Sequence, residues 1–136
     1  MADADLTTRI PSLLTDMDEE HRRVFDGIAA LVLVPQGGFG SAYAALVAEI
    51  EDGFRQEEQI MDLVGYANIK AHRKDHAELL ALLHRLRPYL EDGNAPLVDI
   101  VMGMIPAMLI RHMSGLDQEL ALALRQHAVP AQVANG

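Results

Sequence analysis

The sequence predicts an all-α protein, an up-down-up-down antiparallel bundle of four helices. Apolar residues recur at intervals of three and four in four separate segments, and no segment shows the sustained alternation of a β-strand. Short breaks rich in Gly, Pro and Asn separate the segments, and short connections favour antiparallel neighbours. The chain has three Phe, three Tyr and no Trp, but seven Met. Such an aliphatic core suits packed helices better than aromatic-rich strands.

The first two helices are delimited by glycine and proline. The first is expected at about residues 18–34 and is ended by the segment 35–40, which contains a Pro and three Gly. Ser41 is the predicted N-cap of a second helix over about 42–64. Gly65 follows the last residue of this pattern and is expected to end the helix.

The last two helices are separated by a turn-forming segment and a proline. The third is expected over about residues 69–90, before the turn-forming segment 91–94. The fourth is expected to begin near Pro96, a residue suited to a first helical turn, and to continue to about Leu124. Pro106 lies inside it and should kink it, because proline removes one backbone hydrogen bond.

With 136 residues and no break in composition, the chain has the size of one domain. We expect the bundle to occupy residues 16–128. Residues 1–15 are expected to form an N-terminal arm and residues 129–136 a C-terminal tail.

Charge and composition exclude several classes of function. The net charge of −9 argues against binding to nucleic acid or to an anionic membrane, since both require a basic surface. The N-terminus is acidic, unlike a secretory signal. The longest apolar stretch, Ile100 to Ile110, is shorter than the roughly 18 residues needed to span a bilayer. We therefore expect a cytoplasmic protein without a membrane or nucleic-acid partner.

Each apolar stripe is interrupted by side chains that belong in water or on a metal ion. These side chains are His21, Glu57, His72, His76 and His112. Burial of an unpaired carboxylate costs several kcal/mol or neutralises it by shifting its pKa, so polar groups gathered in one seam need a shared compensation. A bound cation provides it. The chain has no Cys, which leaves His, Asp and Glu as the strong ligands.

The spacing of these residues fits metal binding. His72 and His76 lie one helical turn apart on one face, the spacing at which two imidazoles bind one metal. His112 and Asp117 are five residues apart, which in a regular α-helix separates them by about 140° around the axis. Both can face one metal only if that turn is widened into a π-bulge, and Gly115 between them would ease this.

Taken singly, these residues also fit plainer interpretations. Two His one turn apart are commonly a solvated pair, and a lone buried His is more often hydrogen-bonded than bound to metal. The continuity of His72 and His76 with an apolar stripe favours the core. We expect Glu58, His84 and His127 to face solvent. The methionines on the stripes are expected to fill the core and not to bind metal; they are Met61, Met104 and Met108.

Four short motifs together resemble the hemerythrin family, specifically the single-domain bacterial hemerythrins. The resemblance covers about Asp16 to Leu124. The motifs occur in the family's order and at its separations, one in each predicted helix, at residues 17–25, 54–61, 72–76 and 112–117. Each motif alone is a weak signal, whereas the ordered set is specific.

The resemblance implies a non-haem centre of two iron ions. In the family, the positions of Glu57 and Asp117 bridge the two irons. The other ligand positions that match are three His at one iron and one His at the second; they are His72, His76 and His112 at the first and His21 at the second. The second iron is the one at which the family binds dioxygen.

One residue departs from the family's pattern. Gly53 stands where the family has a further His ligand of the second iron, four residues before Glu57. Gly53 also costs about 1 kcal/mol of helix stability relative to Ala. Water, an exogenous ligand or the carboxylate of Glu49, one turn earlier, are the candidates to fill the vacancy. A second metal that is weakly bound or absent is the remaining alternative.

Three functions follow from this pattern. The first is binding of dioxygen, or a related diatomic molecule such as nitric oxide, at a di-iron centre for storage, delivery or sensing. The second is a di-iron oxidase or peroxidase that uses the open position left by Gly53. The third is a structural or signalling module that has lost most of its metal. Retention of the other six ligand-type residues argues against the third.

Overall fold

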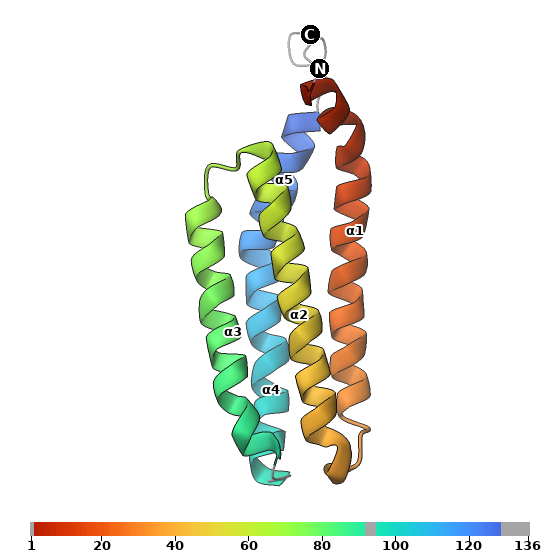
Figure 1. Ribbon diagram of the computed structural model, residues 1–136, viewed down its shortest axis with the longest axis vertical. Coiled ribbons are helices and arrows are strands. Elements are labelled where there is room, and N and C mark those ends of the chain that lie inside the picture. The colour runs from red at the N-terminus through yellow and green to blue at the C-terminus, as the bar shows by residue number, and fades with distance from the viewer. Residues whose placement is uncertain (1, 92–94, 129–136) are drawn as a thin grey trace.

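The computed structural model describes residues 2–91 and 95–128 as helices joined by short turns (Figure 1). The elements are α1 (Ala2–Leu31), α2 (Gln36–Val64), α3 (Ile69–Glu91), α4 (Ala95–His112), a π-helical turn η1 (Met113–Asp117) and α5 (Gln118–Ala128). α4, η1 and α5 follow one another without a break and form one long helix. The described residues contain no strand, and successive helices alternate in direction, which confirms the predicted antiparallel bundle of four helices.

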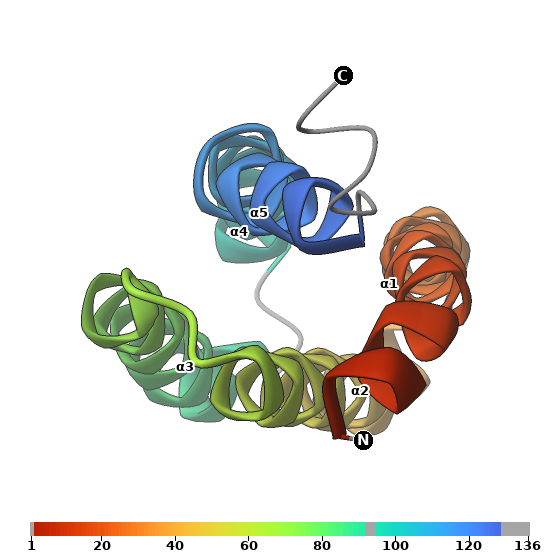
Figure 2. The same ribbon diagram turned by 90° about the horizontal axis from the view of Figure 1, so that it is seen from above.

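The helices surround one central seam (Figure 2). α2 packs between α1 and α3, and the long helix α4–η1–α5 lies across from α2. Its first part packs against α3 and its last part packs against α1. Every helix therefore presents one face to the same interior.

The structure differs from the expected N-terminal arm at residues 1–15. α1 already begins at Ala2, and Leu6 and Ile10 are buried in a cluster with Leu120 and Leu124 of α5. This apolar pattern continues the stripe of the first helix toward the N-terminus. Acidic residues and a proline within the segment obscured it in the sequence.

The second helix begins earlier than predicted. α2 starts at Gln36, so Ser41 lies inside the helix and is not its N-cap. Phe39 and Tyr43 explain the extension, because both are buried and their rings stack with centroids 6.4 Å apart. The hydroxyl of Tyr43 donates a hydrogen bond of 2.8 Å to the carbonyl oxygen of Leu83, which joins α2 to α3.

The other helix ends lie close to their predicted places. Gly65 ends α2 with a left-handed backbone (φ 64°), as predicted for a glycine C-cap. Pro106 lies inside α4, and the helix continues through it. Residues 92–94 and the expected tail 129–136 lie outside the described part of the chain.

Two apolar clusters occupy the core, and a polar layer separates them. One cluster includes Val24, Phe54, Leu79 and Leu109, and the other includes Met17, Ile60 and Leu120. Each of the four helices contains buried polar residues. Along each helix, they follow residues that belong to, or pack against, one apolar cluster and precede residues of the other. The site is therefore placed at mid-height in the bundle.

The last helix is the most apolar. Within the described residues, Pro96–His127 is the one helix long and apolar enough to cross a membrane by length and composition, because it contains an 18-residue window with a mean hydropathy of 1.4. This is weak evidence, because core helices of water-soluble proteins pass the same test. The same helix buries His112 and Asp117 in the bundle, whereas Ile100, Met104 and Ile110 are exposed. Met104 was expected in the core.

The N-terminal extension of α1 can be tested with Ile10→Ala. Because Ile10 is fully buried, the truncation should lower the free energy of unfolding by about 2–4 kcal/mol. Arg9→Ala, on the exposed face of the same turn, is the control and should change it by less than about 0.5 kcal/mol. Thermal or denaturant unfolding measures both. An unchanged stability for Ile10→Ala would mean that the N-terminal segment does not pack on the bundle.

Candidate metal centre

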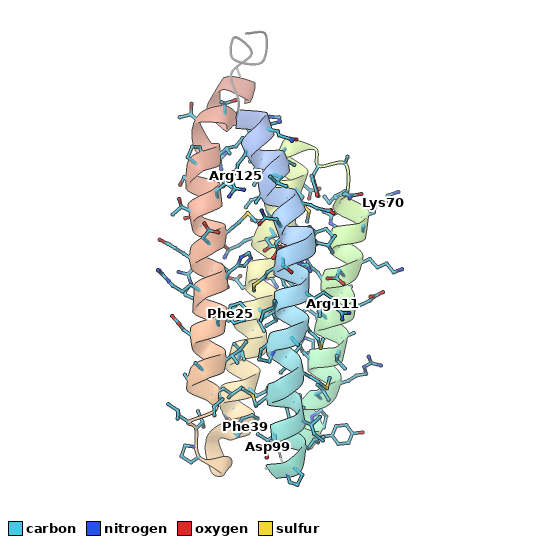
Figure 3. The ribbon with its side chains drawn as sticks, turned by 180° about the vertical axis from the view of Figure 1, so that it is seen from behind. Phe25, Phe39, Lys70, Asp99, Arg111 and Arg125 are labelled. Atoms are coloured by element: carbon cyan, nitrogen blue, oxygen red, sulfur yellow. The ribbon has the colours of Figure 1, made fainter. Side chains whose placement is uncertain are left out.

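The polar layer at mid-height brings all six predicted site residues together. Five are buried and offer ligand atoms that lie within 4.8 Å of one another; they are Glu57, His72, His76, His112 and Asp117. His21 of α1 lies against the same two carboxylates, and its side chain is 22% exposed. The site draws on every helix of the bundle. Figure 3 shows the face of the bundle formed by the long last helix, and it labels Arg111, which precedes His112 in the chain.

Three imidazoles converge on one side of the two carboxylates. The Nε2 atoms of His72 and His76 lie 3.2 and 3.0 Å from Oε1 of Glu57. The Nε2 atoms of His72 and His112 both lie 2.9 Å from Oδ1 of Asp117. Three nitrogen and two oxygen atoms thus point at one small volume, which is a donor set for a single transition-metal ion.

His21 occupies the opposite side of the same carboxylates. Its Nε2 atom lies 3.1 Å from Oε2 of Glu57 and 3.0 Å from Oδ2 of Asp117. Each carboxylate therefore turns one oxygen toward the three imidazoles and the other toward His21. Two carboxylates divided in this way can bridge two cations.

The π-helical turn makes this arrangement possible. Met113–Asp117 forms the widened turn that the sequence required if His112 and Asp117 were to face one site, and both side chains are buried. Both Oδ atoms of Asp117 are buried without a hydrogen-bond donor other than the imidazoles of the site. A carboxylate in this environment is suited to bind a cation.

Two further carboxylates orient the histidine rings. The Nδ1 of His112 donates a hydrogen bond to Asp75, and the Nδ1 of His76 donates one of 3.0 Å to Glu58. An ionised carboxylate can only accept, so each Nδ1 carries a proton and each Nε2 is left to bind metal. Glu58 was predicted to face solvent, and Asp75 was not predicted to take part in the site. Their position next to a ligand residue in the chain was the available signal.

Phe54 holds the ring of His76 in place. The two rings stack with centroids 3.9 Å apart and planes inclined by 6°. Phe54 also contacts the ring of His112, at 5.3 Å between centroids. The apolar ring keeps water away from one side of the imidazoles and restricts their rotation.

The buried charges shift the pKa values of the site. Burial alone would lower the pKa of His21 and His112, but hydrogen bonds to Asp117 and Glu57 outweigh it and raise the two pKa values to about 9 and about 10. The pKa of His72 is raised for the same reason. Burial would raise the pKa of Glu57 and Asp117, yet their hydrogen bonds with the imidazoles hold both below the usual range. Without metal, protonated imidazoles neutralise the carboxylates.

Glu20 of α1 fills the space beside Gly53. The Glu20 side chain is buried, and a Cβ atom on residue 53 would lie only 2.9 Å from its Cγ and Oε1. Glu49, which the sequence suggested for this gap, is not brought there. Its side chain is 42% exposed and lies 3.5 Å from the Nε of Arg23. Glu20 was not predicted as a site residue, because the recognisable ligand of that motif is its neighbour His21.

Three cavities adjoin the site. The largest, about 520 Å³, lies between α3 and the last helix and touches His112 on the side of Asp75, away from the converging Nε2 atoms. Two small cavities of about 10 and 20 Å³ flank Gly53, and both are lined by Glu20 and Glu57. Each is about the size needed for one water molecule.

Comparison with known proteins gives a consistent result. The profile of the family described as Hemerythrin HHE cation binding domain matches residues 12–124. A myohemerythrin of Theromyzon tessulatum is 30% identical over 101 residues, which cover 74% of this chain and 77% of that protein. A bacteriohemerythrin of Ralstonia nicotianae is 24% identical over 115 residues, or 85% and 84% of the two chains. No solved structure gives a significant match.

The shifted pKa values predict how the metal-free protein responds to pH. Raised imidazole pKa values stabilise the fold fully below about pH 6.5, and this contribution is lost as the pH rises through about 9 to 10. The lowered pKa values of Glu57 and Asp117 stabilise it above about pH 4.5, and this contribution is lost in acid. The melting temperature of the metal-free protein should therefore be highest between about pH 4.5 and 6.5.

The control for this pH series is His84→Gln, because His84 is exposed and outside the site. It should melt like the parent protein at every pH. His21→Gln should flatten the decline above pH 6.5. A melting temperature of the parent protein that increases between pH 7 and 10 would contradict the assigned ion pairs.

Proposed function

Because the chain belongs to the hemerythrin family, we propose that it holds two non-haem iron ions in this centre and there binds dioxygen, or a related diatomic molecule such as nitric oxide. The physiological task would be storage, delivery or sensing. The observation that carries the proposal is the division of Glu57 and Asp117 between the two sides of the site. Bridging carboxylates of this kind are a feature of paired metal centres in helical bundles.

The donor atoms suit iron and make the two positions unequal. The first position has three imidazoles and two carboxylate oxygens, whereas His21 and the two remaining oxygens face the second. Imidazole and carboxylate are common iron ligands. Two irons held there would supply a redox-active coordination position open to a diatomic ligand. The first position should bind its metal more tightly because it has more donors.

The surroundings of the second position favour a small neutral ligand. The cavity beside His21 and Gly53 is lined mostly by apolar side chains, among them Val24, Ile50 and Leu109. These side chains exclude bulk water and protons from the centre. At about 10 Å³ the cavity offers no room for an organic substrate. Only a ligand close to the size of a water molecule, such as a diatomic gas, suits this space.

An oxidase or peroxidase is the second candidate, and Gly53 is the observation that favours it. The missing imidazole changes the ligands of the metal at which the family binds dioxygen. A changed or open ligand position favours oxidation of the metal over reversible binding. A metal-poor module is the weaker proposal, because six ligand-type residues gathered within the bundle would then have no cation to stabilise them.

Metal content tests the two-position assignment. We expect two metal ions per chain, measured by elemental analysis after reconstitution with iron(II) under argon. His76→Ala should empty both positions, because the second has too few donors to retain a metal once the first is lost. His21→Ala should empty only one, and His84→Ala, outside the site, should empty neither. Equal losses for His76→Ala and His21→Ala would contradict the assignment.

The visible spectrum distinguishes the three functions. Air is admitted to the reduced, iron-loaded protein and then removed, with the His21→Ala variant as control. Reversible binding should produce an absorption band that disappears with the oxygen and is missing from the variant. Irreversible conversion to the ferric state with consumption of added hydrogen peroxide would support the oxidase or peroxidase. A protein that retains no iron and shows no spectral change would support the structural module.

A further inference from the structure

The geometry around Gly53 points to Glu20 as a ligand of the second metal. We propose that its carboxylate replaces the missing imidazole, so that the second position is formed by His21 and by three carboxylates, those of Glu20, Glu57 and Asp117. This inference rests on the proposed pair of metals and defines the chemistry of one of them.

Glu20 occupies the space that a side chain at residue 53 would need. A Cβ atom at position 53 would lie 2.9 Å from Cγ and Oε1 of Glu20 and 3.2 Å from its Cδ, closer than side chains approach one another. The carboxylate of Glu20 is thus packed against the bare backbone of Gly53. A side chain at residue 53 would force the Glu20 carboxylate to move away from its present position. The absence of a side chain at residue 53 therefore leaves the space that the Glu20 carboxylate occupies.

One carboxylate oxygen of Glu20 has no hydrogen-bond partner among the described residues. The residue is only 8% exposed, and its Oε2 accepts hydrogen bonds of 2.9 and 3.3 Å from Arg23. Its Oε1 is buried and has no hydrogen-bond partner among the described residues. Buried carboxylate oxygens almost always have a donor or a cation. Arg23 neutralises the outer oxygen, and the inner oxygen is left for a metal.

Glu20 lines the same small cavities as other proposed ligands of the second metal. Glu20 and Glu57 together line both small cavities beside Gly53, and His21 lines one of them. Glu20 reaches this space from the contact between α1 and α2, whereas His21 approaches Glu57 and Asp117 from the adjacent face of α1. The cavities are small enough for a single ion or water to contact Glu20 and Glu57.

The proposed ligand set makes the two positions chemically different. Three imidazoles at the first position suit iron and other borderline cations, whereas carboxylates favour harder ions such as Mn²⁺ and the ferric state. Carboxylate-rich sites in helical bundles hold di-iron or di-manganese centres. The second position should therefore prefer Mn²⁺ more strongly than the first, and an iron bound there should be oxidised more readily.

The main test compares Glu20→Gln with Glu19→Gln. Both remove one negative charge from neighbouring residues, but Glu19 is exposed. Anaerobic titration with Mn²⁺, followed by calorimetry and electron paramagnetic resonance, measures each position, and circular dichroism confirms the fold. Glu20→Gln should weaken the second metal by at least about 100-fold, since even indirect partners of metal ligands contribute 10- to 100-fold. The first metal in this variant and both metals in Glu19→Gln should be unaffected.

Rescue by an imidazole provides the second test. Gly53→His alone should displace the Glu20 carboxylate from the second position, because a Cβ atom at residue 53 would lie 2.9 Å from its Cγ and Oε1. Glu20→Ala combined with Gly53→His removes the collision and supplies the imidazole, so the double variant should regain the second metal that Glu20→Ala loses. Failure of a folded double variant to regain it would overturn the proposal that the two groups serve one position.

The remaining outcomes separate this proposal from the proposed function. If Glu20→Gln binds two metals as tightly as the parent protein, Glu20 is not a ligand, although the paired centre stands. If the parent protein itself binds one metal or none, the paired centre is wrong, and the role of Glu20 is rejected with it.

Discussion

Two carboxylates buried at mid-height of the bundle set the requirement that the rest of the structure satisfies. Glu57 and Asp117 lie between two apolar clusters, where a negative charge is costly unless it is matched. The matching groups come from α1, α3 and α4, each of which carries an imidazole to the carboxylates. A helix that slipped along its axis would withdraw its imidazole. The charges thus fix the relative heights of helices whose apolar faces alone would tolerate several alignments.

The centre is built in successive shells around these charges. Asp75 and Glu58 hold the far nitrogens of two imidazoles, and Phe54 stacks on one of the rings. Arg23 holds the outer oxygen of Glu20 at the surface of α1. Protons on the imidazoles and metal ions are therefore alternative ways to neutralise the same oxygens. Folding without metal and binding of metal use one arrangement of side chains.

The sequence predicted correctly those features that depend on the spacing of residues along a single helix. Four apolar periodicities defined the bundle, and the polar interruptions of the stripes identified five of the six site residues. The sixth, Asp117, was indicated by its spacing from His112 and by the family resemblance. The five-residue interval from His112 to Asp117 even required the π-helical turn. These features depend on the geometry of one helix, and the intervals between residues in the sequence are sufficient to predict them.

The parts that were missed depend on contacts between helices. Glu20 is buried because residue 53 of another helix lacks a side chain, and no spacing along α1 reports this. Glu49 looked closer in sequence, yet it points to the surface. The early start of α1 likewise depends on Leu6 meeting α5, far away in the chain. Predicting such features requires the tertiary packing itself.

The π-helical turn also determines which small rearrangements of the gene this helix can absorb. The turn Met113–Asp117 contains one residue more than the α-helical turn that would place His112 and Asp117 on the same face. It is equivalent to an α-helix into which one residue has been inserted. Loss of one residue between His112 and Asp117 would leave an ordinary α-helical turn with both side chains on one face. Loss of two would rotate everything beyond by about 100° and turn Leu120 and Leu124 out of the core. The helix is therefore expected to be insensitive to the shorter deletion and intolerant of the longer one, which unfolding measurements on the two deletion variants would reveal.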